Sequence, residues 1–452
     1  MTTPIADFIS QYADSDFSRL HMPGHKGVAI SGPEKYDITE IYGADELYEA
    51  DGIINMSEDN ATSLFGTAHT FYSTEGSSLV IKAMLMTALQ NSCGHGEKYI
   101  LAARNIHKTF IYGCALLGIE SEWIYPDNPE QLCSCLISAD TLRNSFEQCF
   151  SKHKRLPFAV YITSPDYLGN LQDISSLSAV CKKYRVPLLV DNAHGAYLKF
   201  LSSSLHPVDL GADMCCDSAH KTLPALTGGA YLHVSRFAPY AFLQSARNSL
   251  SIFASTSPSY LILNSLDTVN KYLTDDYSDK LMCCIEEVQN LRSYLRGRGW
   301  YVTDSEPLKL VLDCRSMSID GREVMSLLRQ NMIECEYGSS EHVVMMFTPE
   351  NRMEDYKRIR KALEYVPDGI GFDFPAYTLS KGEKVMSLRD AILSPYEELN
   401  VENSVGRVCA VPTVSCPPAI PIVISGERIT AESINLFKLY GISNVKVVKE
   451  DI

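Results

Sequence analysis

Between about residues 51 and 275, short apolar segments alternate with helical ones, and this alternation constrains the fold more than any other feature of the chain. Strand–helix alternation predicts a mostly parallel sheet covered by helices. Ligands of such sheets bind beyond the carboxyl ends of the strands. We expect strands at 99–103, 158–163, 188–190, 214–216 and 230–234, and helices at 77–89 and 176–184.

A lysine follows the expected strand at 214–216, in the string Asp217-Ser218-Ala219-His220-Lys221-Thr222. A lysine at a strand-end turn, preceded by a hydroxyl and an imidazole, suits a Schiff base with pyridoxal phosphate (PLP). Ser218 and His220 can then donate hydrogen bonds to the phosphate. Taken alone, the string is better explained by a surface lysine in a loop.

An aspartate thirty residues upstream reverses that balance. Asp191 ends the buried strand at 188–190 and is followed by Asn192-Ala193-His194. PLP needs an anion at its pyridine nitrogen, because the protonated ring is the better electron sink. The small Ala193 leaves room for a flat ring, and His194 can reach the ring hydroxyl. The alternative is a helix-capping aspartate, which would not require an Ala-His pair at this offset.

Two further segments fit the same cofactor. The turn Glu75-Gly76-Ser77 leads into an apolar helix, and the N–H groups at a helix start bind anions such as phosphate. We expect Glu75 to point away from the phosphate and to contribute its backbone. His107 follows the strand at 99–103, where its ring can stack on the cofactor; a loop histidine bonded to a backbone carbonyl has equal weight.

Together these strings resemble the Orn/Lys/Arg decarboxylase family, especially its shorter bacterial arginine-decarboxylase-like members. The resemblance covers nearly the whole chain, because the motifs occur in family order. They are His21–Gly27 (HMPGHKG), Asp37–Glu40 with Asp45–Leu47, Arg104–Lys108, Asp191–Gly195, Ser218–Thr227, and Ser404–Arg407 with Pro417–Pro421 and Gly426–Glu427.

The resemblance implies an aspartate-aminotransferase-like fold (fold-type I, α/β) and a role for each matched residue. Lys221 is expected to hold PLP covalently, Asp191 to pair with the pyridine nitrogen and His107 to stack on the ring. The phosphate ligands are expected to be Ser218, His220 and the Glu75–Ser77 backbone. Glu336 falls where the family carries an acid, although Glu334 lies two residues away.

Three departures from the family pattern leave the substrate open. Gly228-Gly229 stands where the family usually has glutamine, Ser73–Ser77 replaces an asparagine-glycine-threonine loop, and Pro417-Pro418-Ala419 replaces a PPG-type turn. For the substrate side chain, Glu336, Asp166 and Tyr167 are candidates, and a structural role is the favoured interpretation of each.

The net charge of −15 argues against nucleic acid and anionic membranes as partners. No segment approaches the roughly 18 apolar residues of a membrane helix, and the first residues do not resemble a signal peptide. Fourteen scattered cysteines without CxxC spacing suggest reduced thiols in the cytoplasm and no metal site.

The chain divides by pattern into four parts. We expect an arm that contacts a partner subunit at 1–50, mostly irregular, and a large PLP-binding domain at 51–275. A small α+β domain is expected at 276–370, with a long helix at 279–297, a strand at 308–312, a helix at 321–330 and a strand at 343–347. A C-terminal domain at 371–452 would hold a helix at 387–392 and a proline-rich region around Pro417.

The predicted function is PLP-dependent α-decarboxylation of a basic amino acid, with arginine to agmatine as the first choice and lysine or ornithine next. Another fold-type I reaction, such as an aminotransferase or an aldolase-type lyase, is the first alternative, because one sequence does not reveal which Cα bond stands perpendicular to the ring. A PLP-binding subunit without activity is the second. The resemblance implies a homodimer with shared active sites, and further assembly is left open.

Overall fold

The computed structural model describes the chain from Met1 to Glu450 except for residues 93–97, 128–130, 366–370, 375–376, 378, 380 and 413–417. Pro417, in the expected proline-rich region, therefore lies outside the described residues. None of the helices in the described part combines the length and apolar character that a bilayer crossing requires.

A seven-stranded sheet has the strand order β1-β7-β6-β5-β4-β2-β3. The pairs β2–β3 and β5–β6 are parallel, whereas β7 runs antiparallel to both β1 and β6. The expected mostly parallel sheet is confirmed. The strands are β1 His69–Ser73, β2 Tyr99–Ala103, β3 Glu120–Ile124, β4 Val160–Thr163, β5 Leu188–Asp191, β6 Met214–Asp217 and β7 Ala230–Val234.

The described chain forms two compact units, each built from three segments. The first comprises Met1–His95, Phe158–Tyr161 and Ile174–Lys280, and the second comprises Gly96–Pro157, Ile162–Asp173 and Leu281–Ile452. The four-part division at residues 50, 275 and 370 stays a prediction.

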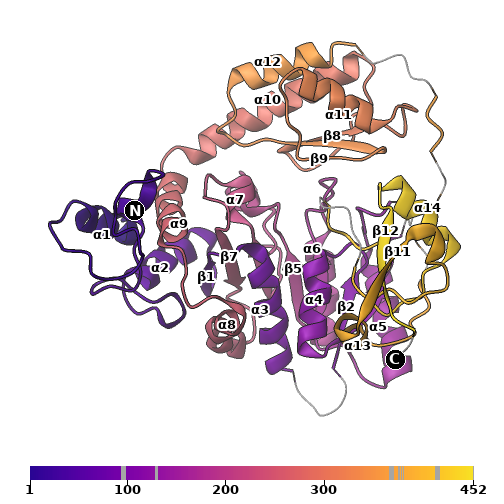
Figure 1. Ribbon diagram of the computed structural model, residues 1–452, viewed down its shortest axis with the longest axis horizontal. Helices are drawn as coiled ribbons and strands as arrows, with labels where there is room; N and C mark the ends of the chain where they lie inside the picture. The colour runs from indigo at the N-terminus through magenta and orange to yellow at the C-terminus, as the bar shows by residue number, and fades with distance from the viewer. Residues whose placement is uncertain are drawn as a thin grey trace. The chain divides into compact units, whose positions relative to one another are not determined.

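In the first unit, helix α3 (Gly76–Gln90) packs against β1, β6 and β7 and also against α8 (Tyr240–Phe253) (Figure 1). Eight of its fifteen residues are buried, as expected for a helix covering a sheet. The remaining α-helices of this unit are α1 Pro4–Ala13, α2 Ile53–Phe65, α6 Ile174–Tyr184, α7 Ala219–Thr222 and α9 Tyr260–Thr274, and a 3-10 helix spans Ala196–Phe200.

The first fifty residues are less irregular than expected, because α1 is a full helix. Pro4 stands in its first turn, where the missing N–H has no intrahelical partner to lose. Ile5 and Ile9 are buried, and the N–H groups of Ile5 and Ala6 donate to the Asp267 carboxylate at 2.9 and 3.0 Å. Two short 3-10 helices, Pro33–Tyr36 and Leu47–Glu49, follow.

In the second unit, a three-stranded antiparallel sheet has the order β8-β10-β9 and packs with α11. Its strands and helices are β8 Lys309–Asp313, α11 Gly321–Gln330, β9 Tyr337–Gly338, β10 His342–Met346 and α12 Met353–Ala362. The expected strands and helix between residues 308 and 347 are present, whereas a separate small α+β domain at 276–370 stays a prediction. The unit also contains α4 Lys108–Leu117 and α5 Ala139–His153, and α10 Tyr277–Gly297 begins in the first unit and ends in the second.

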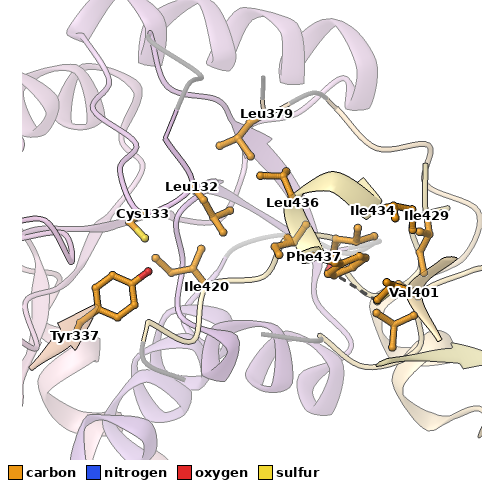
Figure 2. Packing of buried hydrophobic residues seen from close by; sticks show 14 of the residues in the cluster. Leu132, Cys133, Tyr337, Leu379, Val401, Ile420, Ile429, Ile434, Leu436 and Phe437 are labelled. Atoms are coloured by element: carbon orange, nitrogen blue, oxygen red, sulfur yellow. Dashed lines mark hydrogen bonds between the residues drawn. The ribbon is translucent and has the colours of Figure 1, made fainter. Parts of the chain in front are cut away.

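The C-terminal part of the second unit packs around a buried apolar cluster (Figure 2). Its elements are α13 Leu388–Leu393, β11 Tyr396–Asn400, 3-10 helix Val401–Asn403, α14 Ala431–Leu439 and β12 Asn444–Val448. Phe437 of α14 is 1% exposed and lies among Val401, Ile429 and Ile434. This cluster also includes Leu132 and Cys133, so the C-terminal elements share a core with an earlier part of the unit.

Phe437→Ala should lower the free energy of unfolding of this unit by about 3–5 kcal/mol, because it removes a buried ring and leaves a cavity. Urea titration followed by tryptophan fluorescence measures the loss. Leu393→Ala is the control, since Leu393 is 62% exposed. An equal effect of the two substitutions would contradict the packing role of Phe437.

Candidate active site

Lys221 and His194 face each other at the ends of two neighbouring strands. The Lys221 Nζ lies 2.9 Å from the His194 Nε2. Lys221 belongs to the short helix α7 that follows β6, and His194 lies in the loop after β5 and is buried. An ammonium only donates, so the imidazole nitrogen accepts, and the pair can hold a proton between two nitrogens.

Asp191 is a buried carboxylate at the last position of β5. Its Oδ2 accepts from the Tyr161 hydroxyl at 3.2 Å, and its Oδ1 accepts from the Ala193 N–H at 3.2 Å and the Cys216 thiol at 3.4 Å. Burial raises the pKa of the Cys216 thiol well above its ordinary value, so it remains a donor. All three donors are neutral, and together they hold the carboxylate in place.

Hydroxyl groups from two separate segments meet beside the start of α3. The Ser218 hydroxyl donates to the Ser77 hydroxyl at 2.9 Å, which leaves the hydrogen of Ser77 available for another acceptor. Ser77 lies in the first turn of α3, where a backbone N–H has no intrahelical acceptor. An added Cβ on Gly76 would come no nearer than 4.0 Å to the His220 Cε1, so the space over this turn is open.

The Gly228-Gly229 turn fastens this loop. The Gly76 N–H donates to the Gly228 carbonyl at 2.7 Å, and the Glu75 N–H donates to the Ser73 hydroxyl at 3.1 Å. Two of the three backbone donors expected to bind phosphate are therefore already bonded, which leaves Ser77. The Glu75 carboxylate accepts from the Ser255 N–H at 2.7 Å and is thus directed to another loop.

His107 is the N-cap residue of α4, in the second unit. Its Nδ1 accepts from the Thr109 N–H at 3.2 Å and lies 2.9 Å from the Thr109 hydroxyl. These contacts fix the ring at the start of the helix. Stacking of His107 on a cofactor ring stays a prediction.

Of the candidates for the substrate side chain, Glu336 and Tyr167 lie together, whereas Asp166 is used elsewhere. The Tyr167 hydroxyl donates to Glu336 at 2.8 Å. Asp166 is buried and accepts from the N–H groups of Leu168 and Asn170, which makes it a turn-stabilising residue. Its substrate role is therefore not supported by this geometry.

Glu336 lines a cavity of about 420 Å³ in the second unit, together with Glu334, Met346 and Phe347. Glu334 is paired on the surface with Arg329 at 2.8 Å. Glu336 is therefore the better placed of the two acids to receive a cation in this cavity.

A buried cluster behind Ser218 has no counterpart in the sequence motifs. The Asp217 Oδ2 accepts from the Nε2 atoms of His206 and His233 at 3.0 and 3.1 Å, and its Oδ1 accepts from the Asn192 amide at 2.6 Å. Burial opposes ionisation of Asp217, but the two imidazoles outweigh it and lower the pKa of the carboxyl. Burial lowers the pKa of His233.

These three side chains are close enough to ligate a metal ion. A metal would have to displace the hydrogens that both imidazoles direct at one carboxylate oxygen. The Asp217 carboxylate therefore already has hydrogen-bond donors at both of its oxygens. The sequence offered one signal for this cluster, since a carboxylate, Asp217, stands between the buried strand at 214–216 and Ser218.

Most of the chain matches a known protein family. Residues 3–331 match the model of the Orn/Lys/Arg decarboxylase major domain. The fold and the lysine-centred site define a fold-type I PLP enzyme, and the match is long enough to place it further. The chain belongs to the Orn/Lys/Arg decarboxylase family, so it is a PLP-dependent decarboxylase.

Relatives align over nearly the whole chain. A protein named arginine decarboxylase from Bacillus subtilis is 28% identical over 96% of this chain and 93% of its own length. One of the same name from Halalkalibacterium halodurans is also 28% identical, over 96% and 92%. The constitutive lysine decarboxylase of E. coli superposes with a TM-score of 0.81 at 17% identity, covering 99% of this chain and 82% of its own, which shows a shared fold.

The residues present fit PLP. An amine (Lys221), a buried carboxylate (Asp191) and a hydroxyl pair (Ser77 and Ser218) all lie at the carboxyl ends of their strands or at the adjoining helix start. The open space over Gly76 accommodates an anion. This set supplies a covalent anchor, a partner for a ring nitrogen and donors for a phosphate.

Gly228→Ala should weaken PLP binding about tenfold or more, because strained backbone of this kind costs of order 1–3 kcal/mol. Gly228 has φ +101°, and its added Cβ would lie 2.7 Å from the Thr74 carbonyl oxygen, displacing the loop that carries Gly76. Absorbance titration of the apo protein with PLP measures the dissociation constant. Gly297→Ala, with nothing within 4 Å, is the control; equal constants would contradict the role of the turn.

Proposed function

We propose that this chain converts L-arginine to agmatine and carbon dioxide, a step of polyamine metabolism, with Lys221 as the residue that binds PLP covalently. The observation that carries the substrate assignment is full-length similarity to proteins named arginine decarboxylase. Lysine and ornithine are the next candidates, because the family description includes them. The net charge of −15 favours a cationic substrate.

In this proposal each site residue holds one part of the cofactor. Asp191 keeps a proton on the pyridine nitrogen, and Ala193 leaves space for the ring beside it. His194 binds the ring hydroxyl and His107 stacks on the ring face. Ser77, Ser218 and His220 bind the phosphate, with Glu75 and Gly76 shaping the loop through the contacts described above.

When bound, PLP withdraws electrons from the bond between the substrate Cα and its carboxylate. The chain then has to return one proton to Cα, because carbon dioxide leaves without one. Lys221, 2.9 Å from His194, is the proposed donor. The neighbouring imidazole can replace the proton that the lysine gives up.

We also propose that the substrate's distal cation binds Glu336 with Tyr167 beside it. A carboxylate that accepts from a tyrosine hydroxyl is held in one orientation, and it retains acceptor sites for a guanidinium.

The proposed assembly is a homodimer in the cytoplasm. Large apolar side chains are exposed in the arm between residues 17 and 42, which suits contact with a second copy. They are Phe17, Leu20, Met22, Val28, Ile30 and Tyr42. The cysteines among the described residues are all free thiols, which fits a reducing compartment.

The purified protein should release carbon dioxide from arginine faster than from lysine or ornithine. Labelled gas release from each carboxyl-labelled amino acid measures this, with keto-acid formation assayed in parallel. Lys221→Ala should lose both the absorbance of covalently bound PLP and the gas release, because the substitution removes the amine that condenses with the aldehyde. Keto-acid formation without gas, or full activity in the alanine variant, would remove the proposal.

Glu336→Gln should raise KM for arginine about tenfold and change kcat little, since a hydrogen bond to a charged group contributes roughly 1.5–3 kcal/mol. Initial rates over a range of arginine concentrations separate the two constants. Glu334→Gln is the matched control, because Glu334 is paired with Arg329 on the surface. A parallel rise of KM in both variants would point to the overall charge of the unit instead.

A further inference from the structure

The Gly229 carbonyl oxygen fixes both the backbone and the ring of His220. It accepts from the His220 N–H at 3.2 Å and lies 2.9 Å from the ring Nδ1. A carbonyl oxygen only accepts, so Nδ1 carries a hydrogen. A neutral imidazole has a single N–H, which leaves Nε2 as a bare lone pair.

We place the other edge of this ring at the proposed phosphate position. His220 follows Ser218 by two residues, and its Cε1, which joins the two ring nitrogens, is the atom nearest to a Cβ added on Gly76, at 4.0 Å. The Ser77–Ser218 hydroxyl pair is at the same helix start. A lone pair on Nε2 repels a phosphate oxygen, whereas an N–H attracts it. Because Nδ1 is already committed, the ring gains an Nε2–H only by taking up a proton.

We propose that His220 binds the cofactor phosphate as an imidazolium, so that cofactor binding takes up one proton at this residue. The inference rests on the proposed role of this site in holding PLP. It assigns the Gly228-Gly229 turn a task beyond shaping the loop: the turn selects the tautomer that couples cofactor binding to pH.

Burial favours the neutral form of the free ring, and the charges around it do not reverse this. Partial burial lowers the pKa of His220; the bond to Gly229 raises it and the nearby Lys221 lowers it, with a net fall from 6.5. The Lys221 amine is bonded to His194, and the Glu75 carboxylate at the N-cap of α3 is bonded to the Ser255 N–H. Ser77 and Ser218 carry no charge. A phosphate dianion therefore supplies the missing negative charge.

Cofactor binding at this residue weakens as the pH rises. The free ring gives up its proton at a pH below 6.5, whereas the ring bound to phosphate keeps its proton to a higher pH. Between these two limits the apparent dissociation constant of the cofactor should rise about tenfold for each pH unit through this residue alone.

Pyridoxamine phosphate tests this directly, because it carries the ring and phosphate but has no aldehyde to condense with Lys221. The full-length apo protein is titrated by calorimetry at pH 8 in two buffers of different ionisation enthalpy, which yields the number of protons taken up. Wild type should take up about one proton more than His220→Gln, since the amide donates without titrating.

Ser218→Ala is the matched control. The substitution removes a phosphate donor that does not titrate. The variant should therefore bind pyridoxamine phosphate more weakly but take up as many protons as the wild type. Equal uptake by the wild type and His220→Gln would overturn the inference while leaving the PLP site in place. Failure of the wild type to bind pyridoxamine phosphate would instead overturn the proposed function together with the inference.

If the glutamine variant binds too weakly for calorimetry, nitrogen-15 NMR of the histidine rings in the wild type decides. The variant identifies the His220 signals. An Nε2 that gains its hydrogen when pyridoxamine phosphate binds supports the inference, and one that stays unprotonated in the complex contradicts it.

Discussion

A single buried carboxylate, that of Asp217, joins the strand ends on which the candidate site is built. It ends β6, accepts from His233 on β7 and from Asn192 after β5, and receives a third bond from His206. A buried charge is costly unless hydrogen bonds surround it, and here three donors from three segments do so. The hydrogen bonds to this anion therefore fix the position of Asn192, which follows Asp191, relative to Asp217, which precedes Ser218.

The chemistry follows from that register. The parallel strands β5 and β6 end at the same edge of the sheet, so the residues just beyond them, His194 and Lys221, meet although 27 residues separate them. The antiparallel β7 begins at that edge, and the Gly228-Gly229 turn before it contacts the loop at Gly76. The candidate cofactor site is thus built from several turns at one edge of the sheet and not from one contiguous motif.

Apolar strands and strongly patterned helices were predictable. β2 and β7 have the expected bounds, and α11 begins at Gly321 and ends at Gln330 as expected. β3, an edge strand, was missed because its sequence, Glu-Ser-Glu-Trp-Ile, begins with three polar residues and shows neither an apolar run nor a strict alternation. α1 was missed because a proline near the N-terminus suggested irregular chain, whereas the first turn of a helix accepts it.

The sequence by itself determined which chemical groups the site contains and the order in which they occur, since motif residues are read directly from the chain. Only the tertiary structure decided how those groups pair. The Gly76 N–H is already bonded to the Gly228 carbonyl, and the Asp166 carboxylate accepts from the N–H groups of its own turn. The Gly229 carbonyl fixes the tautomer of His220. Hydrogen bonds are short and directional, so partners far apart in sequence are set by the packing of strands and loops, which no local pattern encodes.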